Sequence, residues 1–359
     1  MKFYKLLLIA FAGTLFLYSC SDDDVATVAE DPDPDPGEVT LPFENGFLVT
    51  NQGVSNGSGS VDFVNADLTS VTSDIYQDVN GDTVGMTVQS IGFFGNFAYI
   101  IASESNRIIV VNRFTFEEVA RIETGLENPR YFLEANGKGY VSNWGDPTVT
   151  DDDFVAVINL TTNEVISTIA VGEGPGEMVF DRFNVYVINQ SISTVTIIDP
   201  DLDAVASTLI VGDVPNSLQL DGNGNLWILG GGNLASTGNE TAGSISIINT
   251  ANNQIVTTIP FGAQDHPDYL NISGEDLYYY MDGAVFKSSV SNFQIPNTSI
   301  ISGVDFSNIA LINDGVTLIG TAIGNGVNNG TLQVYSLQNN TLTTTLNVGV
   351  IPNNVYVNP

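Results

Sequence analysis

Few side chains in this 359-residue sequence could carry out nucleophilic, acid–base or metal chemistry. His266 is the only histidine and Cys20 the only cysteine. A metal site that needs several histidines is therefore excluded, and a Ser-His-Asp triad would have only one candidate base. His266 could act alone as a base, although a histidine in a polar loop such as Gln264-Asp-His-Pro-Asp268 is more often a plain surface residue.

Two short segments carry oxygen-bearing side chains at alternate positions, as calcium-binding loops do. They are Asp78-Val-Asn80-Gly-Asp82 and Asp221-Gly-Asn223-Gly-Asn225. Neither segment has a distal bidentate Glu at the usual spacing, and turns rich in Asp-Gly or Asn-Gly give the same pattern. We therefore expect no cofactor, with calcium at these segments as the alternative. Asp82-Thr83-Val84 also resembles a short O-glycosylation motif of Bacteroidota.

The elements that must position such residues follow from an internal repeat. An apolar strand recurs seven times, with its last residue at Asn65, Asn112, Asn159, Asp199, Asn249, Ser288 and Ser336. The spacings are 47, 47, 40, 50, 39 and 48 residues, near the ~40–45 of propeller blades. Gly-x-x-Pro corners at 172–175, 212–215 and 349–352, with a variant at 125–129, help to divide the units into four short strands. The sequence predicts an all-β, seven-bladed β-propeller of four-stranded antiparallel blades over residues 41–359.

The two ends of this region complement each other. If the strands of a blade are named A (innermost) to D, residues 46–51 have the form of a B strand and residues 353–357 that of an A strand. The N-terminal B, C and D strands would then pair with the C-terminal A strand in one composite blade. That pairing closes the ring and removes exposed sheet edges.

Loop length points to one face of the ring. Connections A–B and C–D share one face and are short and uniform, which is typical of hairpin turns. Connections B–C and D–A share the other face and are long and varied, including 143–153, 230–243, 52–59, 77–85, 262–268 and 324–330. Long loops on a rigid scaffold usually carry binding sites, so we expect the ligand on this second face.

Several residues of that face are candidates for ligand binding, and none is assigned a catalytic role. Trp144, next to Asp146, offers an apolar platform for a ring system or a partner protein, or else folds back over its own blade. Arg130 could hold a carboxylate or phosphate, or pair with a neighbouring Asp. Four residues at the starts of A strands could converge on the central channel or bond the corner backbone. They are Asn216, Asp268, Asn308 and Asn353, and His266 completes the candidate set.

Charge and composition exclude several classes of function. The chain has 41 acidic and 9 basic side chains, a formal net charge of −32, and 43% hydrophobic residues. Its hydrophobic share is enough for a large core. A nucleic-acid binder concentrates Lys and Arg on one face, and binding to an anionic membrane surface needs a polybasic patch. Neither pattern occurs, so nucleic acid is excluded as a partner, and we expect membrane attachment through an N-terminal lipid only.

The N-terminal segment has the pattern of a targeting signal. Lys2 and Lys5 precede the apolar run 6–18, which is short for a membrane span and typical of a secretory signal. Leu17-Tyr-Ser-Cys20 resembles a bacterial lipobox, in which Cys20 is lipidated. The acidic residues 22–24 resemble the export signal of Bacteroidota surface lipoproteins. We therefore expect a signal peptide over 1–19, a lipidated, acidic and Pro-rich tether over 20–40, and location on the outer membrane, exposed at the cell surface.

A family resemblance agrees with this organisation. Tyr140-Val-Ser-Asn143, Tyr186-Val-Ile-Asn189 and Leu48-Val-Thr-Asn51 look like the signature of YVTN-type β-propeller repeats. The chain thus resembles YVTN-repeat surface lipoproteins of Bacteroidota, of the DUF5074 and YncE-like kind. It is also similar to propeller lipoproteins that capture cobalamin for a TonB-dependent transporter. That likeness implies a corrinoid ligand and an outer-membrane transporter as partner.

Three functions follow as hypotheses. The first is a non-enzymatic propeller that binds a ligand or partner protein for uptake across the outer membrane. The second is a propeller hydrolase or lactonase that uses carboxylates and calcium, since such enzymes do not need several histidines. The third is adhesion or a scaffold role in an envelope complex. Two carboxylates and a metal at the channel mouth would favour the enzyme, whereas an open basin lined by aromatic and Asn side chains would favour capture.

Overall fold

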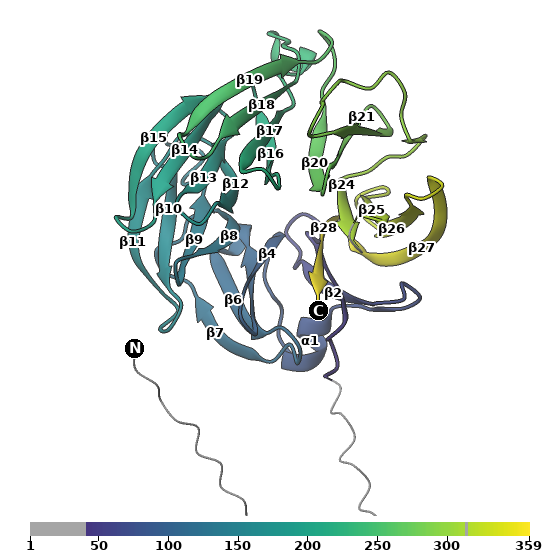
Figure 1. Cartoon of the computed structure of the whole chain (residues 1–359). Helices are drawn as coiled ribbons and strands as arrows, with labels where there is room; N and C mark the ends of the chain where they lie inside the picture. Colours follow the sequence, from purple (N-terminus) through teal and green to yellow (C-terminus); the bar gives the residue numbers. More distant parts are fainter. Residues whose placement is uncertain (1–40, 313–314) are drawn as a thin grey trace, which may run out of the picture. The chain divides into compact units, whose positions relative to one another are not determined.

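The computed structural model describes residues 41–312 and 315–359, so the predicted signal peptide, Cys20 and the tether lie outside the described residues. The described chain forms seven four-stranded sheets, and neighbouring strands within each sheet are antiparallel. Figure 1 shows these sheets as blades around a common centre. The predicted seven-bladed propeller is confirmed. No helix in the described ranges is long and apolar enough to cross a membrane.

The strands fall into four rings from the centre outwards. The inner strands are β28 (Pro352–Asn358), β4 (Val88–Phe94), β8 (Pro129–Ala135), β12 (Pro175–Phe180), β16 (Pro215–Leu220), β20 (Asp268–Ser273) and β24 (Asn308–Ile312). The second strands are β1 (Gly46–Asn51), β5 (Phe97–Ala102), β9 (Lys138–Asn143), β13 (Val185–Asn189), β17 (Asn225–Gly230), β21 (Asp276–Met281) and β25 (Thr317–Ala322). The third strands are β2 (Ser60–Asn65), β6 (Arg107–Asn112), β10 (Phe154–Asn159), β14 (Thr194–Asp199), β18 (Ser244–Asn249), β22 (Ala284–Ser289) and β26 (Asn329–Ser336). The outer strands are β3 (Val71–Thr72), β7 (Glu118–Ile122), β11 (Glu164–Ala170), β15 (Ala204–Ile210), β19 (Gln254–Pro260), β23 (Ile301–Ser302) and β27 (Thr341–Val350).

The tyrosines of the repeat signature join neighbouring blades. Tyr140 in β9 is fully buried, and its hydroxyl donates to Asp203 Oδ1 (2.7 Å) in the turn between β14 and β15 of the next blade. Tyr186 in β13 does the same to Asn253 Oδ1 (2.6 Å) between β18 and β19. Each tyrosine side chain thus buries its aromatic ring between two blades, while its hydroxyl keeps a hydrogen-bond partner. These two tyrosines therefore fix their blades against the next blade along the chain.

The asparagine of the same signature shapes the corner that leads into the inner strand. Asn189 is buried at the end of β13, and a Cβ on Gly172 would lie 2.9 Å from its Cγ. Gly349 has the same relation to Asn51, at 2.6 Å. A side chain at either glycine would displace the asparagine. The Gly-x-x-Pro corner and the Tyr-Val-x-Asn strand are therefore two halves of one local packing unit.

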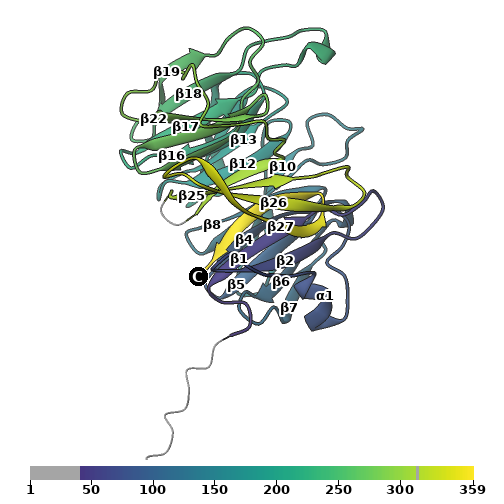
Figure 2. The same ribbon diagram turned by 90° about the vertical axis from the view of Figure 1, so that its right-hand side faces the viewer.

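The ring closes through the ends of the propeller region. β28 pairs antiparallel with β1, from Gly46 opposite Asn358 to Asn51 opposite Pro352, as predicted. Figure 2 shows the C-terminal strand beside β1 and β4. Asn358 is fully buried: its amide donates to the carbonyls of Phe43 and Arg113, and its Oδ1 accepts from Arg113 Nε (2.6 Å). The last strand is therefore fixed by side chains as well as by its ladder.

Two local features differ from the sequence-based expectation. The predicted loop 77–85 overlaps a short helix, α1 (Ile75–Asn80), which Asp74 caps through a bond from Gln77 N and which ends at Gly81. Six residues are too few for a helical period to stand out in the sequence. The segment 290–300 between β22 and β23 is long although it lies on the face predicted to have short turns. Its Phe293 packs on Trp227, with ring centres 5.8 Å apart, so this loop covers core.

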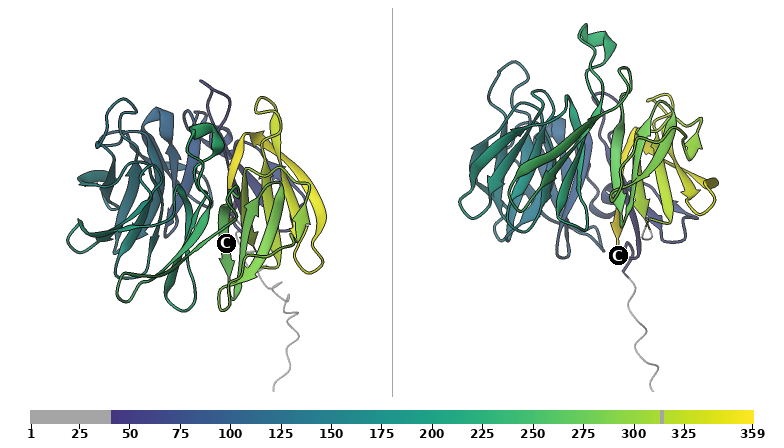
Figure 3. Two further views of the ribbon diagram at one scale, coloured as in Figure 1. Left: turned by 90° about the horizontal axis from the view of Figure 1, so that it is seen from above. Right: turned by 45° about the horizontal axis from the view of Figure 1, so that its top comes forward.

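The long B–C loop 231–243 extends from the ring and contains one 3₁₀ turn, η2 (Ala235–Thr237). Figure 3 shows this green segment projecting beyond the blades in its right-hand view. A second 3₁₀ turn, η1 (Ser103–Ser105), forms the B–C connection of the blade that contains β5 and β6. The face expected to carry elaborated loops therefore does carry them.

Replacement of Asn358 by Ala tests the closure. The change leaves the carbonyls of Phe43 and Arg113 without their amide donor, which should lower the free energy of unfolding by about 1–3 kcal/mol. Urea denaturation measures the loss. Val357→Ala is the matched control, since Val357 is 50% exposed and next in sequence. Equal stability of the two variants would contradict the role given to Asn358.

Candidate functional site

Trp144 and Arg130 form a stacked pair on the face with the long loops. Trp144 follows the buried Asn143 at the end of β9, and Arg130 is the second residue of β8. The guanidinium carbon of Arg130 lies 3.4 Å from the centre of the indole ring. Trp144 Nε1 donates to the carbonyl of Pro175 (2.9 Å), the first residue of the next inner strand. The indole is therefore partly buried and fixed across the gap to the next blade, neither fully exposed nor folded over its own blade.

A hollow of about 250 Å³ opens beside this indole. Its lining comes from B–C and D–A loops only: Asn128, Trp144, Asp146, Pro147, Val149, Thr150, Asp153, Glu173, Gly174, Gln190 and Ser191. Asp146 Oδ1 accepts from the backbone and the hydroxyl of Thr148 (2.8 and 2.7 Å), and these bonds lower the pKa of the Asp146 carboxyl. Asp146 thus holds the loop that forms one wall.

Arg130 stacks on the indole that lines this hollow, and it has spare hydrogen-bonding capacity. Its Nη1 donates to Gln89 Oε1 (3.2 Å), and no carboxylate among the described residues pairs with it within 4 Å. Burial lowers the pKa of Arg130, since water solvates its charge poorly there. In so acidic a chain, a guanidinium without an acidic partner is positioned to bind an anionic group from outside.

The residues predicted at the starts of the inner strands bond mainly to one another and to corners. Asn216 donates to Asp268 Oδ1 (2.6 Å) and to the carbonyl of Pro267 (2.8 Å). Asn308 donates to Asn354 Oδ1 (2.6 Å). Asn216 and Asn308 both line the central channel. Burial raises the pKa of Asp268 to about 6.

Asn353 has a different environment from these three. It is buried, accepts from Thr50 Oγ1 (2.5 Å), and donates to the carbonyls of Val88 and Gln89 in β4 (3.3 and 2.8 Å). It therefore ties β28 to β4, which corresponds to the corner-bonding alternative. Its neighbour Asn354, which the sequence did not single out, lines the channel instead.

The central channel contains two hollows of about 210 and 190 Å³ that share three lining residues: Tyr131, Glu177 and Asn354. Sequence reasoning missed Tyr131 and Glu177. The available signal was their position, since each is two residues after the proline that opens an inner strand, Pro129 or Pro175. Burial raises the pKa of Glu177 to about 7, although the backbone N–H of Leu218 donates to its carboxylate and opposes the shift.

His266 connects two loops of the elaborated face. Its Nδ1 lies 2.7 Å from the carbonyl oxygen of Gly231, and its Nε2 lies 3.5 Å from Glu240 Oε1. These contacts hold the projecting loop 231–243 against the corner before β20. The arrangement gives His266 a role in anchoring this loop.

Several oxygens of the two segments considered for calcium already contact donors within the protein. Asp221 Oδ1 accepts from the N–H groups of Asn223 and Asn225 (2.8 and 2.9 Å), and its Oδ2 accepts from Asn225 Nδ2 and Trp227 Nε1 (both 3.0 Å). Asp78 is exposed on α1, and Asn80 Oδ1 accepts from Glu118 N (2.9 Å). Within residues 41–312 and 315–359, no group of three or more His, Cys, Asp or Glu side chains converges as metal ligands would.

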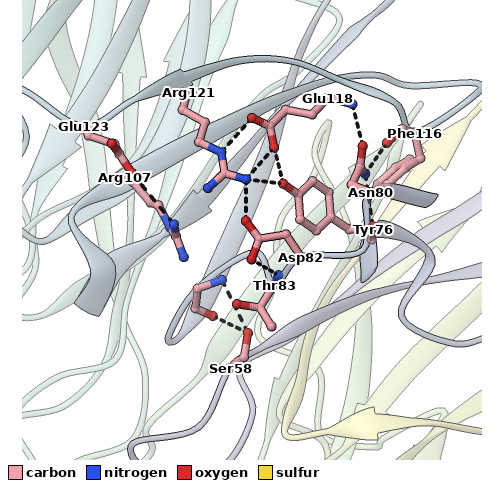
Figure 4. A network of polar contacts seen from close by, with 11 residues as sticks. Ser58, Tyr76, Asn80, Asp82, Thr83, Arg107, Phe116, Glu118, Arg121 and Glu123 are labelled. Carbon is pink, nitrogen blue, oxygen red and sulfur yellow. Dashed lines mark hydrogen bonds and ion pairs between the residues drawn. The ribbon is translucent and has the colours of Figure 1, made fainter. Parts of the chain in front are cut away.

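Asp82 belongs to an ionic network, drawn in Figure 4, that fixes α1 and the following segment to β7. Arg121 Nη2 lies 2.6 Å from Asp82 Oδ2 and also donates to the Tyr76 hydroxyl (3.1 Å). Its Nε and Nη2 contact the two oxygens of Glu118 (2.6 and 2.8 Å). Arg121 lowers the pKa of Glu118. Thr83, the candidate for glycosylation, is exposed beside this network.

Arg121→Met tests the network. Loss of the guanidinium leaves the partly buried Glu118 without its cation, so the free energy of unfolding should fall by about 1–3 kcal/mol at pH 7. Because Arg121 lowers the pKa of Glu118 below its ordinary value of 4.5, this stabilisation is present above pH 4.5. It disappears as the pH falls further and Glu118 becomes protonated.

Denaturant unfolding at pH 7 and pH 3 measures both effects. Lys287→Met, which breaks the exposed pair with Asp276, serves as control and should change stability by under about 1 kcal/mol. A loss for Arg121→Met that is the same at both pH values would show that the ionised carboxylates are not its cause.

Solved structures resemble this chain in fold. A functionally unknown protein from Desulfotomaculum acetoxidans is 14% identical, with a TM-score of 0.66, and the match covers 87% of this chain and 98% of that one. A quinonprotein alcohol dehydrogenase-like protein from Bacteroides thetaiotaomicron is 14% identical, with a TM-score of 0.65 and coverage of 88% and 79%. Hydrazine synthase from Kuenenia stuttgartiensis is 16% identical, with a TM-score of 0.57 and coverage of 88% and 99%.

At these identities the likeness concerns the fold alone. No curated protein matches the sequence. One family does match, over residues 45–346, and it is described as a domain of unknown function, DUF5074. That range begins just before β1 and ends within β27, so it covers all or part of every blade. The chain belongs to the DUF5074 family, and the domain that matches this family is a seven-bladed β-propeller.

Proposed function

We propose that this propeller is a non-catalytic binding protein that captures its ligand at the Trp144–Arg130 pair. The observation that carries the proposal is the guanidinium of Arg130, stacked 3.4 Å from the Trp144 ring and without an acidic partner among the described residues. Stacking sets the direction of the guanidinium before any ligand arrives. Such preorganisation lowers the entropic cost of binding.

The pair favours a ligand that combines an apolar or planar surface with an anionic group. The indole supplies an apolar wall to the hollow of about 250 Å³, and Arg130, stacked on that indole, supplies donors for a carboxylate or phosphate. Corrinoids of the cobalamin type have both features, a wide macrocycle and a phosphodiester. A ligand of that size would rest on the loop face and place only part of its surface in the hollow. We therefore propose a corrinoid as the ligand class.

The proposed setting is the cell surface of a bacterium of the Bacteroidota. It rests on the sequence: Cys20 follows an apolar run with a lipobox-like end, and an acidic, Pro-rich stretch separates Cys20 from the propeller. A lipid at Cys20 would attach the chain to the outer membrane. The partner would be a TonB-dependent transporter that receives the ligand from the loop face. Adhesion or an envelope-scaffold role would instead use the same face for a protein.

The lining of the channel supports capture over hydrolysis. The hollow on one side of Glu177 is lined by amides, hydroxyls and apolar groups from six inner strands, and Glu177 is its only carboxylate. A hydrolase of the carboxylate and calcium type would need several acidic ligands together. Asn216, Asn308, Asn354 and two tyrosines instead give the Asn-rich and aromatic basin expected of a binding protein.

Trp144→Ala tests the proposed site. The full chain, mixed with cobalamin and passed through a desalting column, should retain coloured corrinoid, and the variant should bind at least about tenfold more weakly, as for an anchor residue at an interface. Leu234→Ala is the control, because Leu234 is apolar, 54% exposed and part of the other long loop. It should bind as the parent protein does.

Two results would overturn parts of the proposal. Colourless protein at micromolar concentration would exclude the corrinoid. Coloured protein with equal affinity in the parent and in Trp144→Ala would keep the corrinoid but exclude this site. Arg130→Met then separates the two halves of the pair, since it removes the donors for an anion and leaves an apolar side chain against the indole.

A further inference from the structure

We propose that the central channel is a second binding site, in which Glu177 holds a protonated primary amine. Glu177 lies where the two channel hollows of about 210 and 190 Å³ meet, and it lines both of them. The lining of these hollows includes residues of all seven inner strands, and no Lys, Arg or His is among them. The carboxylate is thus the one formal charge in the lining. A cation that enters the channel would not have to compete with a positively charged side chain for this carboxylate.

The fold does not require a charge at this position. The Glu177 carboxylate accepts from the N–H of Leu218 and so bridges β12 and β16. At the next gap, between β16 and β20, neutral groups make equivalent bridges: Ile272 N donates to Gln219 Oε1 (2.6 Å) and Leu270 N to Ser217 Oγ (2.9 Å). A glutamine at position 177 could therefore make the same bridge between β12 and β16 without a charge. An ionised carboxylate that is half-buried, with no cationic side chain in the lining, carries an unfavourable desolvation cost, and a bound ammonium group would offset that cost.

The groups around Glu177 suit an ammonium group. The Glu177 carboxylate lies close enough to Tyr131 and Tyr356 to raise the pKa of both phenols. Tyr269 lines the larger channel hollow together with Glu177. Phenol oxygens accept hydrogen bonds, and aromatic faces attract cations. Asn308 and Asn354 add amide oxygens. One carboxylate among amides and phenols is too little charge for a typical calcium site, whereas a primary ammonium needs one charge and three acceptors.

The site should depend on pH in a defined direction. Burial raises the pKa of all three tyrosines, so they remain neutral near pH 7, and burial raises the pKa of Glu177 to about 7. Of the other nearby groups, Arg130 beside Tyr131 stays charged, and Asp268 at the strand start has a pKa raised to about 6. An alkylamine stays protonated below about pH 10. Amine affinity should therefore rise with pH through 7 as Glu177 ionises.

The experiment uses 1,4-diaminobutane as the probe and the full chain in a calorimeter. A group with a pKa of about 7 is about 90% ionised at pH 8 and about 10% at pH 6, so the association constant should fall about ninefold at pH 6. Ionisation of Asp268 accounts for much less of that change, because its pKa is lower. The neutral isostere 1,4-butanediol should not bind at either pH.

Glu177→Gln is the decisive variant, because glutamine keeps the acceptor for Leu218 N–H and removes only the charge. It should bind the diamine at least about tenfold more weakly at pH 8, as expected for loss of a charged partner. Its melting temperature at pH 8 should equal or exceed that of the parent, since ionising Glu177 destabilises the fold above pH 7. This measurement separates lost binding from lost folding.

The outcomes are distinct. Diamine binding that weakens at pH 6 and disappears in a folded Glu177→Gln variant supports the site. No binding by the parent at pH 8, or equal binding by parent and variant, overturns it. A lower melting temperature for Glu177→Gln at pH 8 would also overturn it, because the charge would then be structural. Leu234→Ala should leave diamine binding unchanged. Cobalamin capture is measured with another probe and another variant, so either proposal can fail alone.

Discussion

Pairing between the first and last strands of the propeller region is the constraint on which the rest of the structure depends. β28 is the inner strand of the blade that otherwise consists of β1, β2 and β3, so seven blades exist only when the two ends meet. Ordering so long a chain into a ring is entropically costly, and closure removes the edges that an open array would expose. Asn358 and Asn353 secure β28 to the neighbouring blade through bonds to the backbone carbonyls of Arg113 and Gln89.

Around this closed ring, contacts of similar kinds recur between neighbouring blades. The tyrosines of β9 and β13 each reach a turn of the following blade, and polar side chains of β16 bridge the gap to β20 near the axis. Because these contacts hold the blades rigidly, the B–C and D–A loops are free to vary in length and chemistry. The face they form carries a cationic group at Arg130, and the channel carries an anionic one at Glu177. The two proposed sites therefore have opposite preferences for charge.

The architecture was predictable because it repeats. Seven copies of an apolar strand at nearly constant spacing leave little choice of fold, and the strand types at the two ends require the closing pair. Features that occur once were not predictable in this way. The helix α1 depends on a single Asp74 cap within one loop, and the 290–300 segment is long because Phe293 covers Trp227. Neither has a counterpart in the other blades that could have revealed it.

The amino-acid sequence alone was enough to predict the ring, its closure, and the face with long loops, because these depend on periodicity and on turn chemistry within single repeats. It also selected Trp144 and Arg130, but only the tertiary structure stacked them and fixed the indole on the next blade through Pro175. In the two segments considered for calcium, only the tertiary structure shows which groups the carboxylates contact: Asp221 accepts from its own turn, and Asp82 pairs with Arg121 of β7. Glu177 and Tyr131 were hidden in ordinary strand patterns. The position of a residue along one strand does not predict which side chains from six other strands will surround it. Those neighbouring side chains decide its charge, its burial and its function.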